Sequence, residues 1–426
     1  MKYILTIIIF LFAMNILPQN IFAQGEPNNK SSLSSSFSQA KFVPDISFIL
    51  DSSIVYRDRK DEKFDLLAIP EFTHAHDNGD EHEHSHAPMH AHRGFNLNYG
   101  ELALYSAVDP YFELFATFHL STESFEIEEG FINTTSLPAG FQLKIGKFLS
   151  GFGRLNGQHA HYWDFADQPV VYAAFTGDHG ILEKGAQASW IAPIDLYLLI
   201  GAEYLQGENE KSFGYDGFSN NAIEIETSKR PNLYTEFIKT SMDIKELTLL
   251  VGISGAHGKA RINHDLGDDS GHALYGDTNL IGGDVTIKYL IDSYRYLSLQ
   301  GEYLYRKIKG ELYEANTTDT STSEIEKEQS GFYAQLIIKP FLLWRIGSRY
   351  EMLHLNENKI NYVKTDLPDK LCKYSAMIEY NPTEFSRIRL QYNHDRTKYL
   401  DEKNKHINEV ILQFNMSIGA HGAHSF

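Results

Sequence analysis

The chain has 426 residues, with 56 acidic against 38 basic side chains and a formal net charge of −18 at pH 7. Such an acidic chain is a poor partner for nucleic acid and a good one for cations. Its single cysteine, Cys372, excludes an internal disulfide, while 25 tyrosines and 27 phenylalanines give it a surplus of aromatic side chains.

Residues 1–23 are typical of a secretory signal peptide. Lys2 supplies an early positive charge, an apolar run follows over residues 4–14, and residues 21–23 resemble a signal-peptidase site. A membrane anchor is the alternative, but the apolar run is shorter than the roughly 20 residues of a spanning helix. We therefore expect export and a mature chain that begins near Gln24, with 37 basic against 56 acidic residues and a charge of −19.

Residues 24–43 are rich in Ser and Asn, and we expect a flexible N-terminal segment there. From Pro44 to the C-terminus, over 44–426, apolar and polar side chains alternate with a period of two, which predicts an all-β domain. Three stretches illustrate the alternation: Leu297, Leu299, Tyr303 and Tyr305 oppose Ser298, Gln300, Glu302 and Arg306; Trp344, Ile346, Tyr350 and Met352 oppose Arg345, Arg349 and Glu351; Ile388, Leu390 and Tyr392 oppose Arg387, Arg389 and Gln391.

This alternation has two interpretations. In a soluble sandwich the apolar side is core, whereas in an outer-membrane barrel it faces lipid and the charged side faces a wet lumen. No segment after the signal peptide approaches a spanning helix, so a chain embedded in a membrane must close into a barrel. The export signal, the aromatic surplus and the connection lengths favour a transmembrane antiparallel β-barrel.

Short turns containing Pro or Asp alternate with mostly longer polar connections, as in bacterial barrels with short periplasmic turns and long outer loops. The segments between them number sixteen, which places both termini on the periplasmic side and leaves an open aqueous channel. The apolar phase changes near Gly100, so we expect a bulge there and leave the count open by two. The strands are expected to begin near residues 44, 94, 111, 124, 141, 184, 195, 231, 247, 280, 296, 329, 344, 370, 386 and 406, with longer connections near 57–93, 150–184, 207–230, 259–279, 311–328, 358–369 and 397–405.

The connection at 57–93 is dense in histidine, interspersed with Asp and Glu. Neutral imidazole with carboxylate suits Zn²⁺, Cu²⁺ or Ni²⁺, and a His-x-His spacing in an extended chain places both rings on one side. The alternative is a solvated loop that chelates metal adventitiously. We predict a His-rich outer loop that collects metal through His74, His76, His82, His84, His86, His90 and His92.

The connection at 150–184 follows neither strand nor helix periodicity and is rich in glycine and aromatic residues. Structureless loops of this length are uncommon and usually functional. We predict that it folds into the lumen as a constriction loop, with its aromatic side chains packed on the wall and the rings of His159 and His161 and the Asp164 carboxylate directed at the passage. The alternative is that these polar groups satisfy loop hydrogen bonds or line a wet pore. The candidate residues are His159, His161, Trp163, Asp164, Asp167 and His179.

The final expected strand keeps one apolar phase up to Phe426, which resembles the signal by which outer-membrane barrels are recognised for assembly. The runs YFELFATFHL and FEIEEGFINTTSLPAGFQLKIGKFLSGFG resemble early hairpins of the phosphate-selective porin superfamily. The runs RLNGQHAHYWDFADQPVVYAAFTG, SWIAPIDLYLLIGAEYLQG and SIGAHGAHSF are similar to outer-membrane barrels linked to zinc homeostasis, often labelled zinc-regulated outer-membrane receptors. The resemblance covers most of 94–205 and the C-terminus. Phosphate porins rely on Arg and Lys rows, whereas this chain is acidic, so a different cargo is implied.

The motifs of serine hydrolases, zinc proteases and phosphate-binding loops are absent from the sequence, and we predict no enzyme. We predict a porin-like channel in the bacterial outer membrane for uptake of divalent metal ions, chiefly zinc, which is bound as cargo with no cofactor required. The expected partners are membrane lipid, the barrel assembly machinery and divalent metal ions, with a homotrimer left open and nucleic acid excluded. The alternatives are a TonB-dependent-type metal receptor, for which residues 24–43 are too short a plug, and a non-transporting barrel for binding or adhesion.

Overall fold

The computed structural model describes residues 44–73, 91–122, 124–209, 211–220, 222–264, 266, 271–315, 320–400 and 403–419. The predicted signal peptide and N-terminal segment lie outside the described residues, as does Phe426. The same holds for every histidine of the His-rich loop except His92, which is exposed to solvent.

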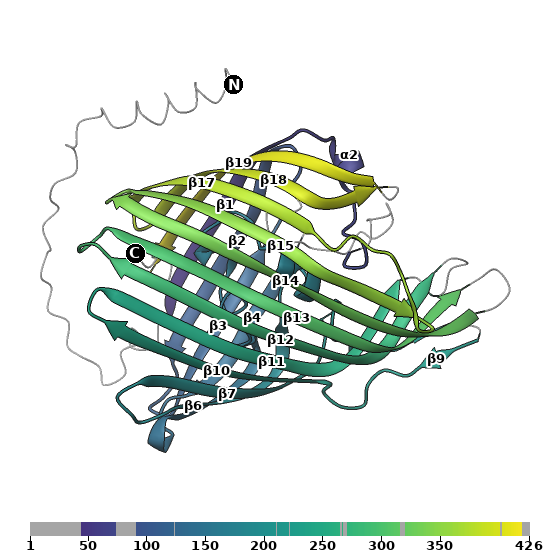
Figure 1. The fold of residues 1–426 in the computed structure, drawn as a ribbon. Helices are drawn as coiled ribbons and strands as arrows, with labels where there is room; N and C mark the ends of the chain where they lie inside the picture. Colours follow the sequence, from purple (N-terminus) through teal and green to yellow (C-terminus); the bar gives the residue numbers. More distant parts are fainter. Residues whose placement is uncertain are drawn as a thin grey trace, which may run out of the picture. The chain divides into compact units, whose positions relative to one another are not determined.

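Sixteen antiparallel strands close into a barrel, as the alternation predicts (Figure 1). The main sheet has seventeen strands, but β16 (Val363–Lys364) is only a two-residue arm on β15. The barrel closes where β1 pairs with β19, from Ser47 opposite Gly419 to Arg57 opposite Glu409. The barrel strands are β1 (Asp45–Arg57), β2 (Gly94–Ala107), β3 (Phe112–Leu120), β4 (Phe125–Thr134), β5 (Phe141–Leu149), β6 (Leu182–Ile191), β7 (Tyr197–Leu205), β10 (Leu233–Ile244), β11 (Leu247–His264), β12 (His272–Leu290), β13 (Tyr296–Ala315), β14 (Thr320–Phe341), β15 (Trp344–Ile360), β17 (Leu371–Thr383), β18 (Ser386–Leu400) and β19 (Lys403–Gly419).

The remaining elements are short and lie in the connections. Among the described residues, no helix combines the length and the apolar character needed to cross a membrane. These elements are the hairpin of β8 (Phe218–Ser219) and β9 (Glu224–Ile225), the helices α2 (Asp61–Phe64) and α3 (Val170–Thr176), and the 3₁₀ turns η4 (Pro138–Gly140) and η5 (Ala160–Tyr162).

The strands keep their polar side chains inside the barrel and their apolar side chains outside. On β13, Gln300 and Glu302 are buried while Leu299 and Tyr303 are exposed at the outer surface. This inverts the order of a soluble protein and suits a wall between lipid and a polar lumen, which is why the two-residue period identified the strands. The predicted bulge near Gly100 is present, because the register between β1 and β2 shifts at Asp51/Ser52.

Fourteen of the sixteen predicted strand starts lie within three residues of the structure, but β12 starts at His272 instead of near 280 and β14 at Thr320 instead of near 329. Several predicted outer connections are also wrong in extent. Residues 259–279, 311–328 and 397–405 were expected to be polar connections, yet most of each range belongs to strands. Residues 358–369 were expected to be another connection, and the first three of them belong to β15. For example, β13 runs on to Ala315 and β14 already starts at Thr320. Outside the lipid layer both faces of a strand can be polar, so the alternation fades although the backbone ladder continues.

The wall is therefore uneven in length. On one side β3 has 9 residues and β4 has 10, close to the roughly 9–11 residues that span a membrane. On the other side β12 has 19, β13 has 20 and β14 has 22 residues, so these strands continue well past the lipid layer (Figure 1).

Candidate functional site: an inner loop held in the lumen

The connection between β5 and β6, residues 150–181, folds into the barrel, as predicted. We call it the inner loop. Its first turn is anchored to Glu302 of β13, which accepts hydrogen bonds from the backbone amides of Arg154 at 2.8 Å and Leu155 at 2.9 Å and from the Tyr172 hydroxyl at 2.7 Å. Gly153 makes this approach feasible, because its φ is 61° and a side chain there would collide with Tyr172 and Glu302.

Two further connections cover the inner loop, which the sequence analysis did not predict. All residues of α3 are buried. In the connection between β1 and β2, Phe72 stacks on Phe175 with ring centroids 5.6 Å apart. In the connection between β7 and β10, the Ser212 hydroxyl donates to the Phe175 carbonyl and the Asn209 amide donates to the Thr176 carbonyl at 2.6 Å. Three connections thus share the lumen.

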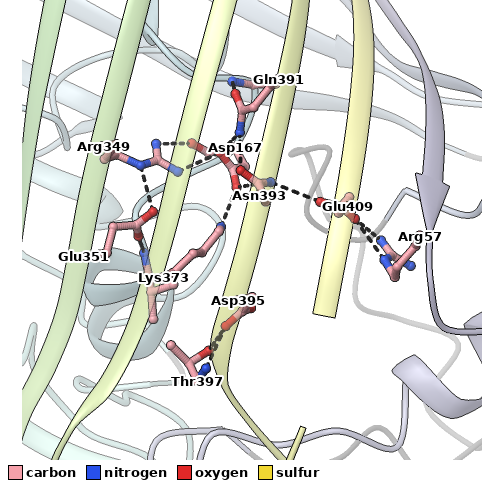
Figure 2. A network of polar contacts seen from close by, with 12 residues as sticks. Arg57, Asp167, Arg349, Glu351, Lys373, Gln391, Asn393, Asp395, Thr397 and Glu409 are labelled. Atoms are coloured by element: carbon pink, nitrogen blue, oxygen red, sulfur yellow. Dashed lines mark hydrogen bonds and ion pairs between the residues drawn. The ribbon is translucent and has the colours of Figure 1, made fainter. Parts of the chain in front are cut away.

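Asp167 lies at the centre of a buried ion-pair network (Figure 2). Arg349 of β15 donates to one Asp167 oxygen at 2.6 Å and to Glu351 at 2.7 Å, and Lys373 of β17 pairs with the other Asp167 oxygen. Burial alone would raise the pKa of the Asp167 carboxyl, but Arg349 and Lys373 hold it well below its usual range. Two cations meet two anions here, so the network is compensated within the protein.

The network continues along the wall toward the closing strands. Asn393 of β18 donates to Asp167 at 3.2 Å and to Glu409 of β19 at 3.1 Å, and Glu409 pairs with Arg57 of β1 at 2.7 Å. Figure 2 shows these side chains converging on the inner loop from neighbouring strands. Asp167 therefore connects the loop to the whole side of the barrel from β15 to β1.

Basic wall residues also hold the backbone of the inner loop. Arg387 and Arg389 of β18 donate to the carbonyl oxygens of His161 at 2.8 Å and Trp163 at 2.9 Å. These arginines were expected to line a wet lumen. They do face inward, but both are buried against the loop.

Asp164 pairs with Arg345 of β15 and accepts a hydrogen bond from the Gln335 amide at 3.0 Å. A small cavity of about 10 Å³, which is space for about one water molecule, adjoins this group, and its lining includes Asp164, Gln335 and Arg349. Asp164 therefore borders only a water-sized gap, and its carboxylate is held by Arg345 and Gln335.

The two inner-loop histidines lie against an acidic part of the wall. The Nε2 atom of His159 is 2.7 Å from Glu129 of β4, and the Nδ1 atom of His161 is 3.1 Å from Glu101 of β2. Glu128 lies 3.5 Å from the other ring nitrogen of His159, and the two imidazoles stack at 5.8 Å. Burial lowers the pKa of the His159 imidazole, but Glu101 and Glu128 more than offset this and hold it well above its usual value.

The predicted orientation of these histidines is therefore wrong. His161 is buried, and His159 is largely covered and turned toward the wall instead of the passage. The physical reason is charge, because the imidazoles meet three glutamates on β2 and β4. Trp163 is buried as predicted, and its indole donates to the Gln158 carbonyl at 3.2 Å. His179 is exposed at the far end of the loop, away from this pair in sequence.

Glu101, Glu128 and Glu129 were not predicted as site residues from the sequence. A bulge explains why two consecutive glutamates both reach the lumen side: Thr117 of β3 pairs with Glu129, while Phe118 pairs with Ile127, which leaves Glu128 as the extra residue. The only signal in the sequence was the phase change in the run from Glu126 to Asn133.

Comparison with known proteins supports the fold. No protein-family model matches the chain. An uncharacterized protein of Aquifex aeolicus (strain VF5) is 51% identical over 393 residues, which cover 92% of this chain and 82% of the relative. The outer membrane channel DcaP of Acinetobacter baumannii superposes with a TM-score of 0.52 at 12% identity, over 91% of this chain and 100% of that one. A loop L8 deletion mutant of OmpT, an outer membrane protein of Vibrio cholerae, superposes with a TM-score of 0.50 at 11% identity, over 88% of this chain and 99% of that one.

Proposed function

This chain belongs to the same family as the uncharacterized Aquifex aeolicus protein and is an outer-membrane β-barrel, and we propose that it works as a porin-like channel for the uptake of divalent metal ions, zinc in particular. The observation that carries the proposal is the inner loop, which brings imidazole and carboxylate groups into the lumen of a sixteen-strand barrel. The likeness to DcaP, described as an outer membrane channel, supports a role as a channel.

We expect the channel to prefer cations because the chain is acidic, and we expect basic side chains on the inner surface of the wall to limit this preference. The chain carries a net charge of −18, which favours cations over anions near the barrel. Arg345, Arg349, Arg387 and Arg389 lie on the same inner surface, and their charges are largely used in holding the inner loop. We therefore expect a moderate preference for cations.

The His-rich sequence fits the role of a metal collector. It begins directly after Thr73, and the adjacent Phe72 packs on Phe175 of the inner loop. At its other end the backbone amide of Arg93 donates to Asp61 at 3.2 Å. Metal bound by the predicted ligands His74 to His92 would thus be released close to the covered lumen. The zinc-regulated subgroup, a homotrimer and the assembly machinery remain predictions from the sequence.

Planar-bilayer recordings of the purified protein test the proposal. A passive channel gives stepwise conductance and, in a salt gradient, a reversal potential of the sign expected for cations. Zinc-loaded liposomes that contain the protein should lose zinc to an external chelator faster than zinc-loaded liposomes without the protein. Clear anion selectivity would contradict the metal-uptake proposal, and a silent bilayer would favour an energised receptor or an adhesion barrel.

A further inference from the structure

A group of metal-ligand side chains lies where the inner loop meets the wall. Glu101 of β2, Glu128 of β4 and His159 of the inner loop each offer one ligand atom, and these atoms all lie within 4.8 Å of one another. We propose that these three residues bind one divalent metal ion, for which Zn²⁺ is the best-matched species, and that this ion fastens the inner loop to the wall. The site goes beyond the proposed function, because the ion can bind there whether or not ions cross the barrel.

The contact with Glu129 places a hydrogen on the Nε2 atom of the His159 imidazole. An ionised carboxylate only accepts hydrogen bonds, so the Nε2 atom of His159, 2.7 Å from Glu129, carries the hydrogen. The other oxygen of Glu129 accepts a hydrogen bond from the Leu149 amide at 2.7 Å, which holds the carboxylate in place. A histidine that binds metal through one nitrogen commonly donates the other N–H to a carboxylate in this way.

The second ring nitrogen then points at the two remaining carboxylates. His159 Nδ1 is buried and lies 3.5 Å from Glu128 and 3.6 Å from Glu101, which is longer than an ordinary hydrogen bond. Without metal, a proton on this nitrogen offsets the two carboxylates, and a metal ion that binds here would displace that proton and take the nitrogen lone pair.

The distances suit zinc. Tetrahedral zinc with bonds of about 2.0–2.1 Å places neighbouring ligand atoms roughly 3.3–3.4 Å apart. The two nitrogen-to-oxygen distances of 3.5 and 3.6 Å are close to this, and the carboxylate oxygens of Glu101 and Glu128, which lie within 4.8 Å of each other, can reach it by rotation of their side chains. Three protein ligands also leave a fourth position for water, which is the arrangement of an exchangeable ion.

Charge favours a divalent ion over a proton. Glu101, Glu128 and Glu129 carry three negative charges, and a protonated His159 compensates only one of them. Two protein cations face this region. Lys144 of β5 interacts with Glu129 but lies over the rings of Phe131 and Phe148, and Arg387 of β18 is held by the His161 carbonyl.

The bulge in β4 supplies the second wall ligand. A regular strand would point Glu128 and Glu129 to opposite faces, into the lumen and into the lipid. With Glu128 as the extra residue, one glutamate can bind the ion while its neighbour orients the histidine. His161 adds to the same arrangement, because its Nδ1 lies 3.1 Å from Glu101.

The test uses the full-length chain in detergent, stripped with a chelator and then soaked with Zn²⁺. Crystals measured on either side of the zinc absorption edge should show an anomalous peak among Glu101, Glu128 and His159. This measurement needs no variant. A peak only at other histidines, or no peak at saturating Zn²⁺, would overturn the site.

Calorimetric titration with Zn²⁺ adds matched variants. Glu128→Gln should remove one zinc equivalent per chain from the isotherm, and Glu129→Gln should weaken the same equivalent roughly 10-fold or more because it orients the ligand. Glu126→Gln, on the same strand and with the same change of charge, should leave the isotherm unchanged. An unchanged isotherm for Glu128→Gln would overturn the proposal.

Conductance recordings test the proposed channel independently of the proposed metal site. If Glu128→Gln loses the zinc equivalent, the site stands whatever the bilayer recordings give. If the protein conducts cations but the anomalous peak is missing, the channel proposal stands and the site fails.

Discussion

Within the inner loop, the segment from His159 to Asp167 is held in opposite ways at its two ends, which we call the histidine end and the aspartate end. At the aspartate end, Asp167 meets Arg349 and Lys373, and the charges balance within the protein. At the histidine end, His159 meets glutamates of β2 and β4, and negative charge is left over. The charges at the aspartate end are neutralised without a ligand, whereas the excess negative charge at the histidine end would be stabilised by a bound cation. The inner loop can therefore remain in the lumen through its contacts at Asp167, while its contact at His159 changes with bound metal.

The largest effect on the position of the inner loop is expected from Asp167→Asn. It leaves Arg349 and Lys373 buried beside a single carboxylate, and breaking a buried pair of this kind costs about 3–5 kcal/mol. The inner loop should leave the lumen while the strands stay assembled, so single-channel conductance should rise and protease should cut within 150–181. Asp195→Asn, in an exposed turn, is the control and should change neither quantity. Unchanged conductance in Asp167→Asn would mean that the aspartate end does not hold the loop.

A smaller effect on the position of the inner loop is expected when the histidine side chains that contact the wall are removed. The double variant His159→Ala, His161→Ala loses the contacts to Glu129 and Glu101, at about 1–3 kcal/mol for each buried hydrogen-bond partner left unpaired. The aspartate end should keep the loop in place, so protease resistance should persist. Any conductance block by micromolar Zn²⁺ should disappear. A block of unchanged strength would place the blocking ion elsewhere.

Mild acid should not release the aspartate end. Because the folded-state pKa of Asp167 lies below that of an unfolded chain, about 3.9, its stabilising contribution is complete above that pH and is lost only as the pH falls through the lower folded value. Protease resistance of the inner loop should therefore be constant from about pH 8 to pH 5, measured without metal. Release of the loop between pH 7 and pH 5 would show that another group controls it.

The smallest effect on the inner loop is expected from deleting residues 74–90. The deletion keeps Phe72, which stacks on Phe175, so the cover over α3 stays in place. The zinc equivalents bound by the predicted collector should be lost in a calorimetric titration, while the equivalent assigned to His159 is retained. Retention of all zinc equivalents would show that the His-rich stretch is not a collector.

Prediction from sequence worked best for the wall. The starts of β13, β15 and β18 were predicted at residues 296, 344 and 386, where the structure has them. Alternation is a local property, since each residue faces lipid or lumen according to its own polarity. The same method overestimated the outer connections, because β13 and β14 continue into water where polarity no longer differs between the faces.

The amino-acid sequence by itself determined the closed barrel, the inward position of Glu302, Glu351 and Arg389, and the departure of a loop near residues 150–184 from the wall, because these depend on periodicity and composition along the chain. The structure ends this loop at residue 181, and β6 begins at Leu182. Only the tertiary structure decided which wall groups the loop meets. His159 meets Glu128 and Glu129 because a bulge turns both toward the lumen, and no local pattern specifies which strand a loop thirty residues away will face. Contacts between distant segments depend on the whole closed wall, so their chemistry appears only once the barrel has formed.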